Sequence, residues 1–545
     1  MMNHTLGMRR RGIRRATTAI AAASVVVALA ACAPSDNGNG APEEGAADAD
    51  GESQGSADPD GTIRAGISYE LGTNGYDPMT TSAALTVAVN WHTLEGLTEL
   101  DPATGEPYNA LAADGLEEVD ETTYTATLRD GAVFHDGTPV TADDVVFSFD
   151  RVLDPDNNSL YSQFIPFIES VDAIDDTTVQ LNLEYPVGVL EERVAVVKIV
   201  PQAAVEEDLD AFDANPIGTG PYEMTDNGAG GTVKLERFDD YTGDHPAQVK
   251  ELVWDVLPDA TARVNALASD SVSAIDSVPY LDIETLEAQG AEVESVQGFG
   301  LLFAMFNMSS DNFSDVRNRQ ALMYAIDMDK VIDTALLGHA EAASSFVQSS
   351  HPNYNEAEVV YEYDPEKAKE LFEETGLMGE EITMLSTDHD WVAKVTPLIK
   401  ESLDEIGVKV VLDEGQSAGQ YTKIDGGEDY DVLIAPGDPS VFGNDPDLLM
   451  RWWYAGDTWT DQRMHWKGQD SYDEIQGLLD DALQETDEAK RQELWNETYD
   501  ALSREIPLYP LFHRKVPTAW SADDLTGFEP ISLTGLSLMD VGLAG

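Results

Sequence analysis

The sequence predicts a mixed α/β protein with more than one hydrophobic core. Its 545 residues, of which 42% are hydrophobic, exceed what a single compact core usually contains. Helices and strands alternate between residues 365 and 435 at the spacing of parallel βαβ units. Residues 124–151 combine a strand, two turns and a capped helix. Short-strand modules and βαβ units are therefore expected in the same chain.

The N-terminal half reads as short strands with a few helices. A strand is expected over residues 62–68, followed by a glycine-rich loop, and a helix is expected over residues 83–97. Three further segments show strand alternation or helical spacing: a hairpin over 171–183, two strands within 232–257 and a helix over 260–268. The paired glycines Gly218 and Gly220 are expected in a tight turn.

The central segment, residues 124–151, carries the clearest local signals. Apolar residues alternate over 124–128, and Asp-Gly pairs at 130–131 and 136–137 mark turns. Thr141 is the expected N-cap of a helix with two aspartates in its first turn. Three apolar residues then recur on one helical face: Val145, Phe149 and Val152.

The C-terminal half alternates between helices and strands. Asp315 and Asp327 each precede a helical pattern, where an aspartate accepts hydrogen bonds from the first turn. Helices are further expected over residues 365–375, 392–406, 472–483 and 489–502. Strands are expected over residues 382–385, 408–412 and 431–435.

The N-terminus has the pattern of an export signal. Arginines concentrated between residues 9 and 15 precede an apolar run over 19–31 that is too short for a membrane span. The run ends in Leu-Ala-Ala-Cys, which resembles a bacterial lipobox and implies a signal peptide over 1–31 with acylation of Cys32. A plain signal peptide with an incidental cysteine is the alternative, and Sec and twin-arginine export both stay open. Because Cys32 is the only cysteine, no disulfide can form within the chain.

Residues 32–60 are expected to be the acylated cysteine and a disordered acidic linker. Residues 33–60 contain no basic residue and nothing apolar larger than alanine or proline, so they cannot bury a core. A flexible coil of this length spans roughly 30 Å. The sequence GESQG at 51–55 fits a hydrolase pattern, but it lacks the strand-to-helix elbow that such a nucleophile requires.

The charge balance excludes some partners. The chain has 102 acidic and 31 basic residues, a formal net charge of −71, which argues against nucleic acid and against unaided binding to an anionic membrane. Solvation of a salt-adapted extracellular protein is the favoured explanation, and steering of cationic ligands is the alternative.

Catalytic and metal signatures are missing from the sequence. It has no P-loop, H-E-x-x-H or C-x-x-C motif, and the calcium-like start at 154–159 lacks the glycine and glutamate that the loop requires. The sequence therefore predicts a binding protein, not an enzyme, with no cofactor and no metal.

Four separate segments resemble the family 5 (peptide/nickel-type) solute-binding proteins of ABC importers. In family order they are residues 95–106, 124–151, 215–222 and 306–327. The resemblance covers about residues 62–530 and implies a two-lobed periplasmic-binding-protein-like α/β fold (type II, cluster C). That fold has an extra subdomain in its first lobe and a hinged cleft.

The resemblance also implies domain limits and partners. Lobe I with its extra subdomain is expected over 61–300, lobe II over 301–512 and a return to lobe I over 513–545. The implied protein is a monomeric, lipid-anchored receptor on the outer face of the cytoplasmic membrane. It binds a peptide between its lobes and delivers it to the permease and ATPase subunits of an ABC transporter; an oligosaccharide or a metal chelate is the alternative ligand.

The implied ligand-binding residues lie around two loops. A strand ending near 435 would present Pro436, Gly437 and Asp438 at its C-terminal end, where α/β clefts hold ligands. In peptide-binding relatives an aspartate at this position binds the ligand's α-ammonium, so Asp438 is the matching residue. The loop after the first strand borders the cleft in the family and supplies four candidates: Glu70, Leu71, Gly72 and Asn74.

Aromatic residues and a histidine complete the candidate set: His389, Trp391, Trp452 and Trp453. Dipeptide-binding relatives also carry an arginine before a helix of the second lobe, which clamps the ligand's carboxylate. The corresponding stretch here, residues 386–391, contains no arginine. This departure favours longer peptides, cationic or amidated ligands, or a saccharide over dipeptides alone.

Overall fold

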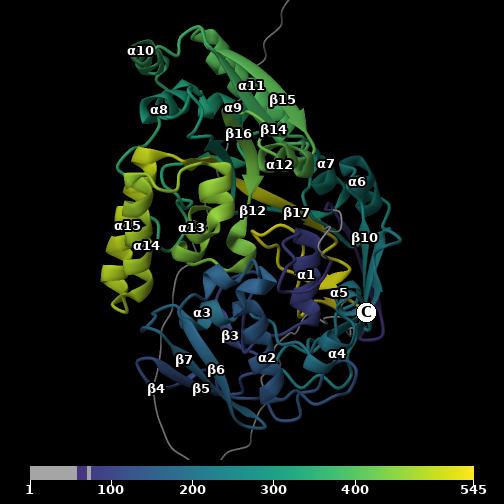
Figure 1. Ribbon diagram of the computed structural model, residues 1–545. Coiled ribbons are helices and arrows are strands. Elements are labelled where there is room, and N and C mark those ends of the chain that lie inside the picture. The colour runs from purple at the N-terminus through teal and green to yellow at the C-terminus, as the bar shows by residue number, and fades with distance from the viewer. Residues whose placement is uncertain (1–57, 70–74) are drawn as a thin grey trace, which may run out of the picture. The chain divides into compact units, whose positions relative to one another are not determined.

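A sheet of eleven strands runs through the computed structural model, which describes residues 58–69 and 75–545 (Figure 1). Its order is β15-β14-β16-β12-β17-β11-β1-β10-β9-β8, with β13 paired to β17 beside this path. The two long central strands are β12 (Glu292–Phe306) and β17 (Leu508–Trp520), which pair in an antiparallel register. The register shifts between Gln297 and Leu301, so β12 bulges at its centre.

On one side of this pair lie strands connected by a helix. β14 (Glu381–Thr387) leads through α11 (Val392–Glu405) to β15 (Lys409–Gly415), and the two strands are parallel. β16 (Val432–Gly437) is parallel to β14 and antiparallel to β12. The predicted βαβ unit is therefore confirmed, although β16 extends two residues beyond its predicted end and includes Pro436 and Gly437.

On the other side the sheet continues with strands from the N-terminal half. β1 (Thr62–Ile67) is parallel to β10 (Glu251–Val256), which pairs antiparallel with β9 (Thr232–Arg237). β8 (Tyr222–Asn227) forms the edge. The long pair β12–β17 thus joins two groups of strands that are far apart in the sequence.

A separate four-stranded sheet contains the central segment. Its strands, in order, are β4 (Glu117–Asp120), β5 (Thr123–Thr127), β7 (Thr178–Leu183) and β6 (Ile168–Asp175). Helix α2 (Ala142–Leu153) packs on this sheet. Thr141 and Asp144 form a reciprocal capping box, in which Asp144 N–H donates to Thr141 Oγ1 over 3.3 Å and Thr141 N–H donates to Asp144 Oδ2 over 3.0 Å. The predicted cap and the predicted buried face are confirmed.

The other α-helices and strands of the described residues, together with the short helix η4, complete the fold. They are α1 (Ala84–Thr93), β2 (Thr98–Leu100), β3 (Pro107–Asn109), α3 (Leu190–Val194), α4 (Gln202–Glu207), α5 (Leu209–Ala214), α6 (Ala260–Ala268), β11 (Ala274–Ile275), α7 (Ile283–Gln289), α8 (Val316–Ala325), α9 (Met328–Ala335), β13 (Ala340–Ala342), α10 (Pro365–Thr375), α12 (Ser417–Asp425), η4 (Pro439–Phe442), α13 (Pro446–Tyr454), α14 (Asp470–Gln484), α15 (Glu488–Glu505), β18 (Leu525–Thr526) and β19 (Gly542–Leu543). Asp315 and Asp327 cap α8 and α9 as predicted. The helix predicted over 83–97 ends earlier, at Thr93, because Leu94 turns the backbone to an extended conformation.

Gly218 and Gly220 serve close packing instead of a tight turn. A Cβ at Gly218 would lie 2.0 Å from the carbonyl oxygen of Thr93, and one at Gly220 would lie 2.6 Å from that of His92. The His135 ring bridges the same segment, since its Nδ1 accepts from Gly218 N–H (3.3 Å) and its Nε2 donates to the Gly220 carbonyl (3.0 Å). Burial lowers the pKa of His135 to about 4, so the ring stays neutral in this role.

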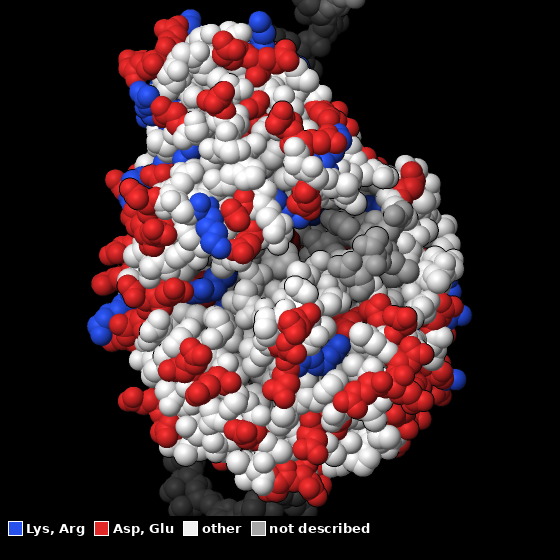
Figure 2. All heavy atoms as spheres, in the orientation of Figure 1, with Lys and Arg blue, Asp and Glu red and all other residues white. Residues whose placement is uncertain are grey.

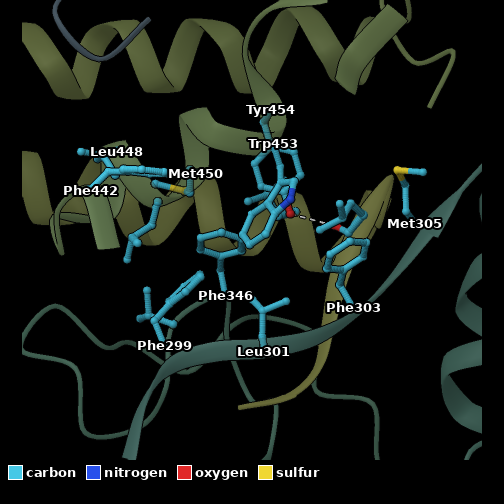
Figure 3. Packing of buried hydrophobic residues seen from close by; sticks show 14 of the residues in the cluster. Phe299, Leu301, Phe303, Met305, Phe346, Phe442, Leu448, Met450, Trp453 and Tyr454 are labelled. Atoms are coloured by element: carbon cyan, nitrogen blue, oxygen red, sulfur yellow. Dashed lines mark hydrogen bonds between the residues drawn. The ribbon is translucent and has the colours of Figure 1, made fainter. Parts of the chain in front are cut away.

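The largest hydrophobic core packs β12 against α13. Figure 3 shows Trp453 among aromatic residues of β12 and of the loop that carries Phe346. The Trp453 ring centroid lies 5.6 Å from that of Phe303 and 6.2 Å from that of Phe346. Tyr454 donates from its hydroxyl to the Leu508 carbonyl oxygen over 2.8 Å, which ties α13 to β17.

Acidic side chains dominate the surface that Figure 2 shows, and lysine and arginine appear there only in small groups. No helix within residues 58–69 and 75–545 is long and apolar enough to cross a membrane. The predicted signal peptide, Cys32 and the linker up to residue 57 lie outside the described residues. At the start of the described residues, Asp58 N–H donates to the Leu543 carbonyl oxygen (3.1 Å).

Candidate functional site

A cavity of about 220 Å³ lies where β12, β16 and β17 meet. Its walls include three of the predicted residues in sequence, Pro436, Gly437 and Asp438, together with His389 and Trp391. The structure therefore brings together two predicted groups from different loops. Tyr69, Arg514 and Thr534 also line this cavity, and none of them was a predicted site residue.

The end of β16 positions Asp438. Gly437 pairs with Leu301 of β12, just after the β12 bulge, and Asp438 then caps the short helical turn η4. Its Oδ1 accepts from Ser440 N–H (3.3 Å) and from the Ser440 hydroxyl. Gly300 lies next to the Asp438 side chain, and a Cβ on Gly300 would be 3.3 Å from Asp438 Oδ2. The bulge therefore leaves Oδ2 room to face the cavity.

The second carboxylate oxygen of Asp438 has no partner among the described residues. Oδ2 is shielded from solvent and accepts no hydrogen bond from any described residue. Burial raises the pKa of Asp438 to about 6, and the bonds from Ser440 lower it only in part. An unsatisfied buried carboxylate costs free energy, which a cationic donor entering the cavity would recover.

Arg514 of β17 brings a buried positive charge to the same cavity. The side chain is 7% exposed, and its guanidinium carbon lies 4.9 Å from the centre of the Trp391 ring. Burial alone would lower the pKa of Arg514, but the neighbouring Tyr280, Tyr69 and Asp438 raise it, so the guanidinium stays charged. The arginine that is missing from residues 386–391 is thus matched by one from another part of the chain.

The sequence did contain a signal for Arg514. β17 reads as a buried strand of mostly apolar residues, interrupted by His513 and Arg514. A charge in such a strand is rarely fully buried without a partner or a function. Only the fold shows that this strand passes beside Asp438, which precedes Arg514 by 76 residues in the chain.

The histidine of the pocket is held in one orientation. His389 Nδ1 lies 3.1 Å from Thr387 Oγ1, at the end of β14. Burial is the main cause that lowers the pKa of His389, so a neutral ring is favoured at neutral pH. Trp391, two residues later, forms the N-terminal boundary of α11.

Two predicted tryptophans lie outside the cavity lining. Trp453 is 1% exposed and supports the floor, because a Cβ on Gly437 would be 2.6 Å from its Cζ2. Trp452 stacks on Phe164 at 6.2 Å between ring centroids, away from the cavity. Four predicted residues lie outside the described residues: Glu70, Leu71, Gly72 and Asn74. The described part of the chain also contains no cluster of three or more His, Cys, Asp or Glu suited to a metal ion.

A second group of buried charges lies between α3 and α13. Arg193 is fully buried and donates to both oxygens of Asp445 (2.7 and 2.8 Å), to Asp447 (2.6 Å) and to the Phe164 carbonyl (2.8 Å). Arg451 also binds Asp447, over 2.8 Å. Every carboxylate in this network has a cationic partner, in contrast to Asp438.

Comparisons with known proteins identify the family of the chain. Residues 106–466 match the family described as "Bacterial extracellular solute-binding proteins, family 5 Middle". The chain is 27% identical over 475 residues to the glutathione-binding protein GsiB of Escherichia coli K12, which covers 86% of this chain and 92% of that protein.

Solved structures show the same fold. AgaA from A. tumefaciens R10, in complex with agropinic acid, has 27% identity and a TM-score of 0.78, covering 89% of this chain and 99% of that chain. A dipeptide-binding protein from Pseudoalteromonas sp. SM9913, in complex with Met-Leu, has 22% identity and a TM-score of 0.79, covering 88% and 99%. This likeness confirms the predicted two-lobed α/β fold.

Proposed function

This chain belongs to the family 5 bacterial extracellular solute-binding proteins, and from that premise we propose that it captures a peptide by its free amino terminus. Proteins of this family bind peptides or related ligands for ABC import and are not enzymes. The observation that carries the proposal is the buried Oδ2 of Asp438 in this cavity, which accepts no hydrogen bond from a described residue. An α-ammonium group is a compact donor of the required charge.

The peptide assignment is supported from two directions. A relative at 27% identity is a glutathione-binding protein, and structures of the same fold hold Met-Leu and a nonapeptide. Within the cavity, the polar groups of Tyr69, His389 and Thr534 lie beside Asp438 and can meet a peptide backbone.

A non-peptide solute is the second candidate. AgaA, also 27% identical, holds agropinic acid, and a similar fold in Campylobacter jejuni NikZ holds Ni(L-His). His389 could contact a metal chelate. An oligosaccharide is less well supported, because Trp452 and Trp453 do not line the cavity and offer no stacking surface there.

The proposed mechanism is closure of two lobes on the ligand, followed by delivery to an ABC permease. The proposed lobe limits are 61–300 with 513–545, and 301–512. The chain would pass from the first lobe to the second at residues 300/301, at the β12 bulge, and would return at residues 512/513, within β17. Both connections between the lobes would therefore lie on the paired long strands. The ligand shifts the equilibrium only by its preference for the closed form.

The proposed receptor is a monomer held at the outer face of the cytoplasmic membrane. Cleavage after residue 31 and acylation of Cys32 would provide the anchor, and the acidic linker would provide reach toward the permease and ATPase subunits. The motif at Cys32 supports this arrangement.

Native mass spectrometry of the chain, purified from its own host in detergent, tests the proposal. The expected result is a set of bound masses that fragment as peptides. A single mass that corresponds to a hexose multiple or to a metal chelate would retain the fold and reject the peptide assignment. The mass at Cys32 in the same experiment tests acylation directly.

A further inference from the structure

We propose that Arg514 binds a carboxylate of the same ligand whose ammonium binds Asp438, so that the pocket selects zwitterions. The preferred ligands are short peptides or amino-acid conjugates that carry both charges within the reach of one cavity. This inference rests on the proposed function, because it places the ligand in the Asp438 cavity. It adds a specificity-determining residue on β17 and narrows the ligand class.

Arg514 differs from the other buried arginines in what surrounds it. Each of six arginines that are at most 8% exposed donates at least one hydrogen bond to a carboxylate or carbonyl oxygen: Arg151, Arg193, Arg263, Arg319, Arg451 and Arg491. Among the described residues, Arg514 donates no hydrogen bond to a carboxylate or carbonyl oxygen, and Tyr280 is the neighbour that contributes most to raising the pKa of Arg514. A guanidinium has five N–H donors, so the described residues leave most of this capacity unused.

Asp438 and Arg514 face one cavity without neutralising each other. Both line the 220 Å³ cavity, yet no Arg514 nitrogen lies within 4.0 Å of an Asp438 oxygen, the limit for an ion pair. Each charge is therefore left without a close counter-ion in the described part of the protein. A ligand that carries one ammonium and one carboxylate would satisfy both charges at once.

The residues around Arg514 orient its guanidinium group for binding a planar anion. Trp391 stacks at 4.9 Å and is itself 6.0 Å from the Phe512 ring centroid, which fixes one face of the cation. Stacking occupies the face and leaves the N–H edge free, which is the edge that binds carboxylates in a bidentate manner. Tyr280 donates its hydroxyl proton to the Lys515 carbonyl over 3.1 Å, so its oxygen can only accept from Arg514.

The size of the cavity limits the class of ligand. At about 220 Å³ it is smaller than the roughly 300–1,000 Å³ typical of pockets for drug-sized ligands. A long peptide would place its terminal carboxylate outside such a space. The pair of charges therefore favours ligands of one to three residues with both ends free.

Isothermal titration of the full chain against matched peptides tests this inference. The probes are dipeptides and tripeptides with free ends, each also prepared as the C-terminal amide and as the N-acetyl derivative. On the unmodified protein, amidation and acetylation are each expected to weaken binding by roughly 10- to 100-fold. This comparison needs no substitution and so does not depend on the folding of a variant.

Substitutions then assign the effect to a residue. In Arg514→Gln the free peptide should bind as weakly as the amide binds the unmodified protein, amidation should no longer matter, and acetylation should still weaken binding. Arg514→Lys should restore part of the difference. Lys515→Gln is the matched control. Lys515 is the cation next to Arg514 in the sequence but does not line the cavity, so this substitution should leave all three affinities unchanged.

The outcomes separate this inference from the proposed function. Peptides that bind equally well with free and amidated ends would overturn the role of Arg514 and leave peptide binding in place. An amidation effect that persists in folded Arg514→Gln would assign the carboxylate to another residue and also overturn it. Failure of every peptide to bind would overturn both.

Discussion

Two buried arginines, Arg193 and Arg514, show how the same side chain serves different ends. Arg193 is 0% exposed and is surrounded by carboxylates of Asp445 and Asp447 at 2.6–2.8 Å. Arg514 is 7% exposed and has no carboxylate within ion-pair distance among the described residues. Arg193 forms ion pairs within the fold, whereas Arg514 faces a cavity. Pairing, and not burial, distinguishes the two arginines, and it is the reason why a ligand-binding role is proposed for Arg514 alone.

The sequence around each arginine explains the difference. Asp445 and Asp447 stand at the start of α13, where Asp445 also accepts from Leu448 N–H (3.1 Å). Contacts within α13 therefore hold both aspartates in place, and Arg193 binds them in that position. Asp438 caps only the short turn η4 and uses one oxygen to do so. Its other oxygen, like the guanidinium of Arg514, has no ion-pair partner among the described residues of this cavity.

The largest expected effect comes from breaking the paired region. Arg193→Gln would leave Asp445 and Asp447 buried with much less positive charge, and this should lower the free energy of unfolding by about 3–5 kcal/mol. Urea unfolding followed by tryptophan fluorescence measures the loss. Arg317→Gln is the control, because Arg317 and Asp315 form an exposed pair on α8 that should hardly change the midpoint. Equal midpoints for both variants would remove the structural role of Arg193.

The same kind of change in the pocket should affect binding and not folding. Asp438→Asn removes the charge that binds an ammonium, and affinity for amine-bearing peptides should fall by roughly 10- to 100-fold. The unfolding midpoint should not fall, because the substitution also removes an unsatisfied buried carboxylate. Titration calorimetry and thermal unfolding of one preparation give both values. Unchanged peptide affinity would exclude Asp438 from the site.

The pH dependence sharpens the contrast. The pKa of Asp438 is raised from 3.8 to about 6 by burial, so the folded chain binds more protons than the unfolded chain between these values. Its contribution to stability is therefore lost as the pH rises through this window. Ammonium binding requires the ionised form, so affinity should fall by roughly tenfold for each pH unit below 6.

Binding measured at pH 5 and 7.5 tests this dependence. Asp438→Asn should flatten the profile, whereas His389→Gln should retain it, because burial lowers the pKa of His389 and so disfavours its protonation in the same cavity. Arg514 stays charged over the whole range and contributes no slope. If the pH dependence were lost in His389→Gln and retained in Asp438→Asn, the titrating group would be His389 and not Asp438.

The smallest expected effect concerns the β12 bulge. Gly300→Ala would place a methyl group 3.3 Å from Asp438 Oδ2, close enough to hinder an ammonium but not to unfold the strand. A loss of affinity of a few-fold is expected, measured against Gly419→Ala on α12, where a methyl group meets no atom within 4 Å. Equal affinities for the two variants would indicate that the ligand approaches Oδ2 from another direction.

Local signals in the sequence predicted most of the elements. Thr141 and Asp144 specify the start of α2 through their own side chains, and Pro365 and Ala260 begin helices at the predicted residues. Short helices without such signals, α3 among them, were missed. They form because surrounding residues bury them, as Arg193 shows, and a single-sequence pattern does not contain that information.

The site was predicted only as far as sequence neighbourhood allows. Pro436, Gly437 and Asp438 follow a strand, and their position at a cleft could be inferred from that strand alone. Trp452 and Trp453 lie close by in the sequence, but α13 turns them into the core. Arg514 reaches the cavity from β17, and only the strand order reveals that proximity.

The position of Arg514 on the long β12–β17 pair has a mechanical consequence. This pair is shared by both groups of strands, so a side chain fixed to it moves little when one group rotates against the other. A carboxylate held there would stay bound in both the open and the closed form of the proposed receptor. Arg514 would then provide affinity before closure, whereas groups such as Tyr69, which follows β1, and Asp438, which follows β16, would supply the energy that favours closure.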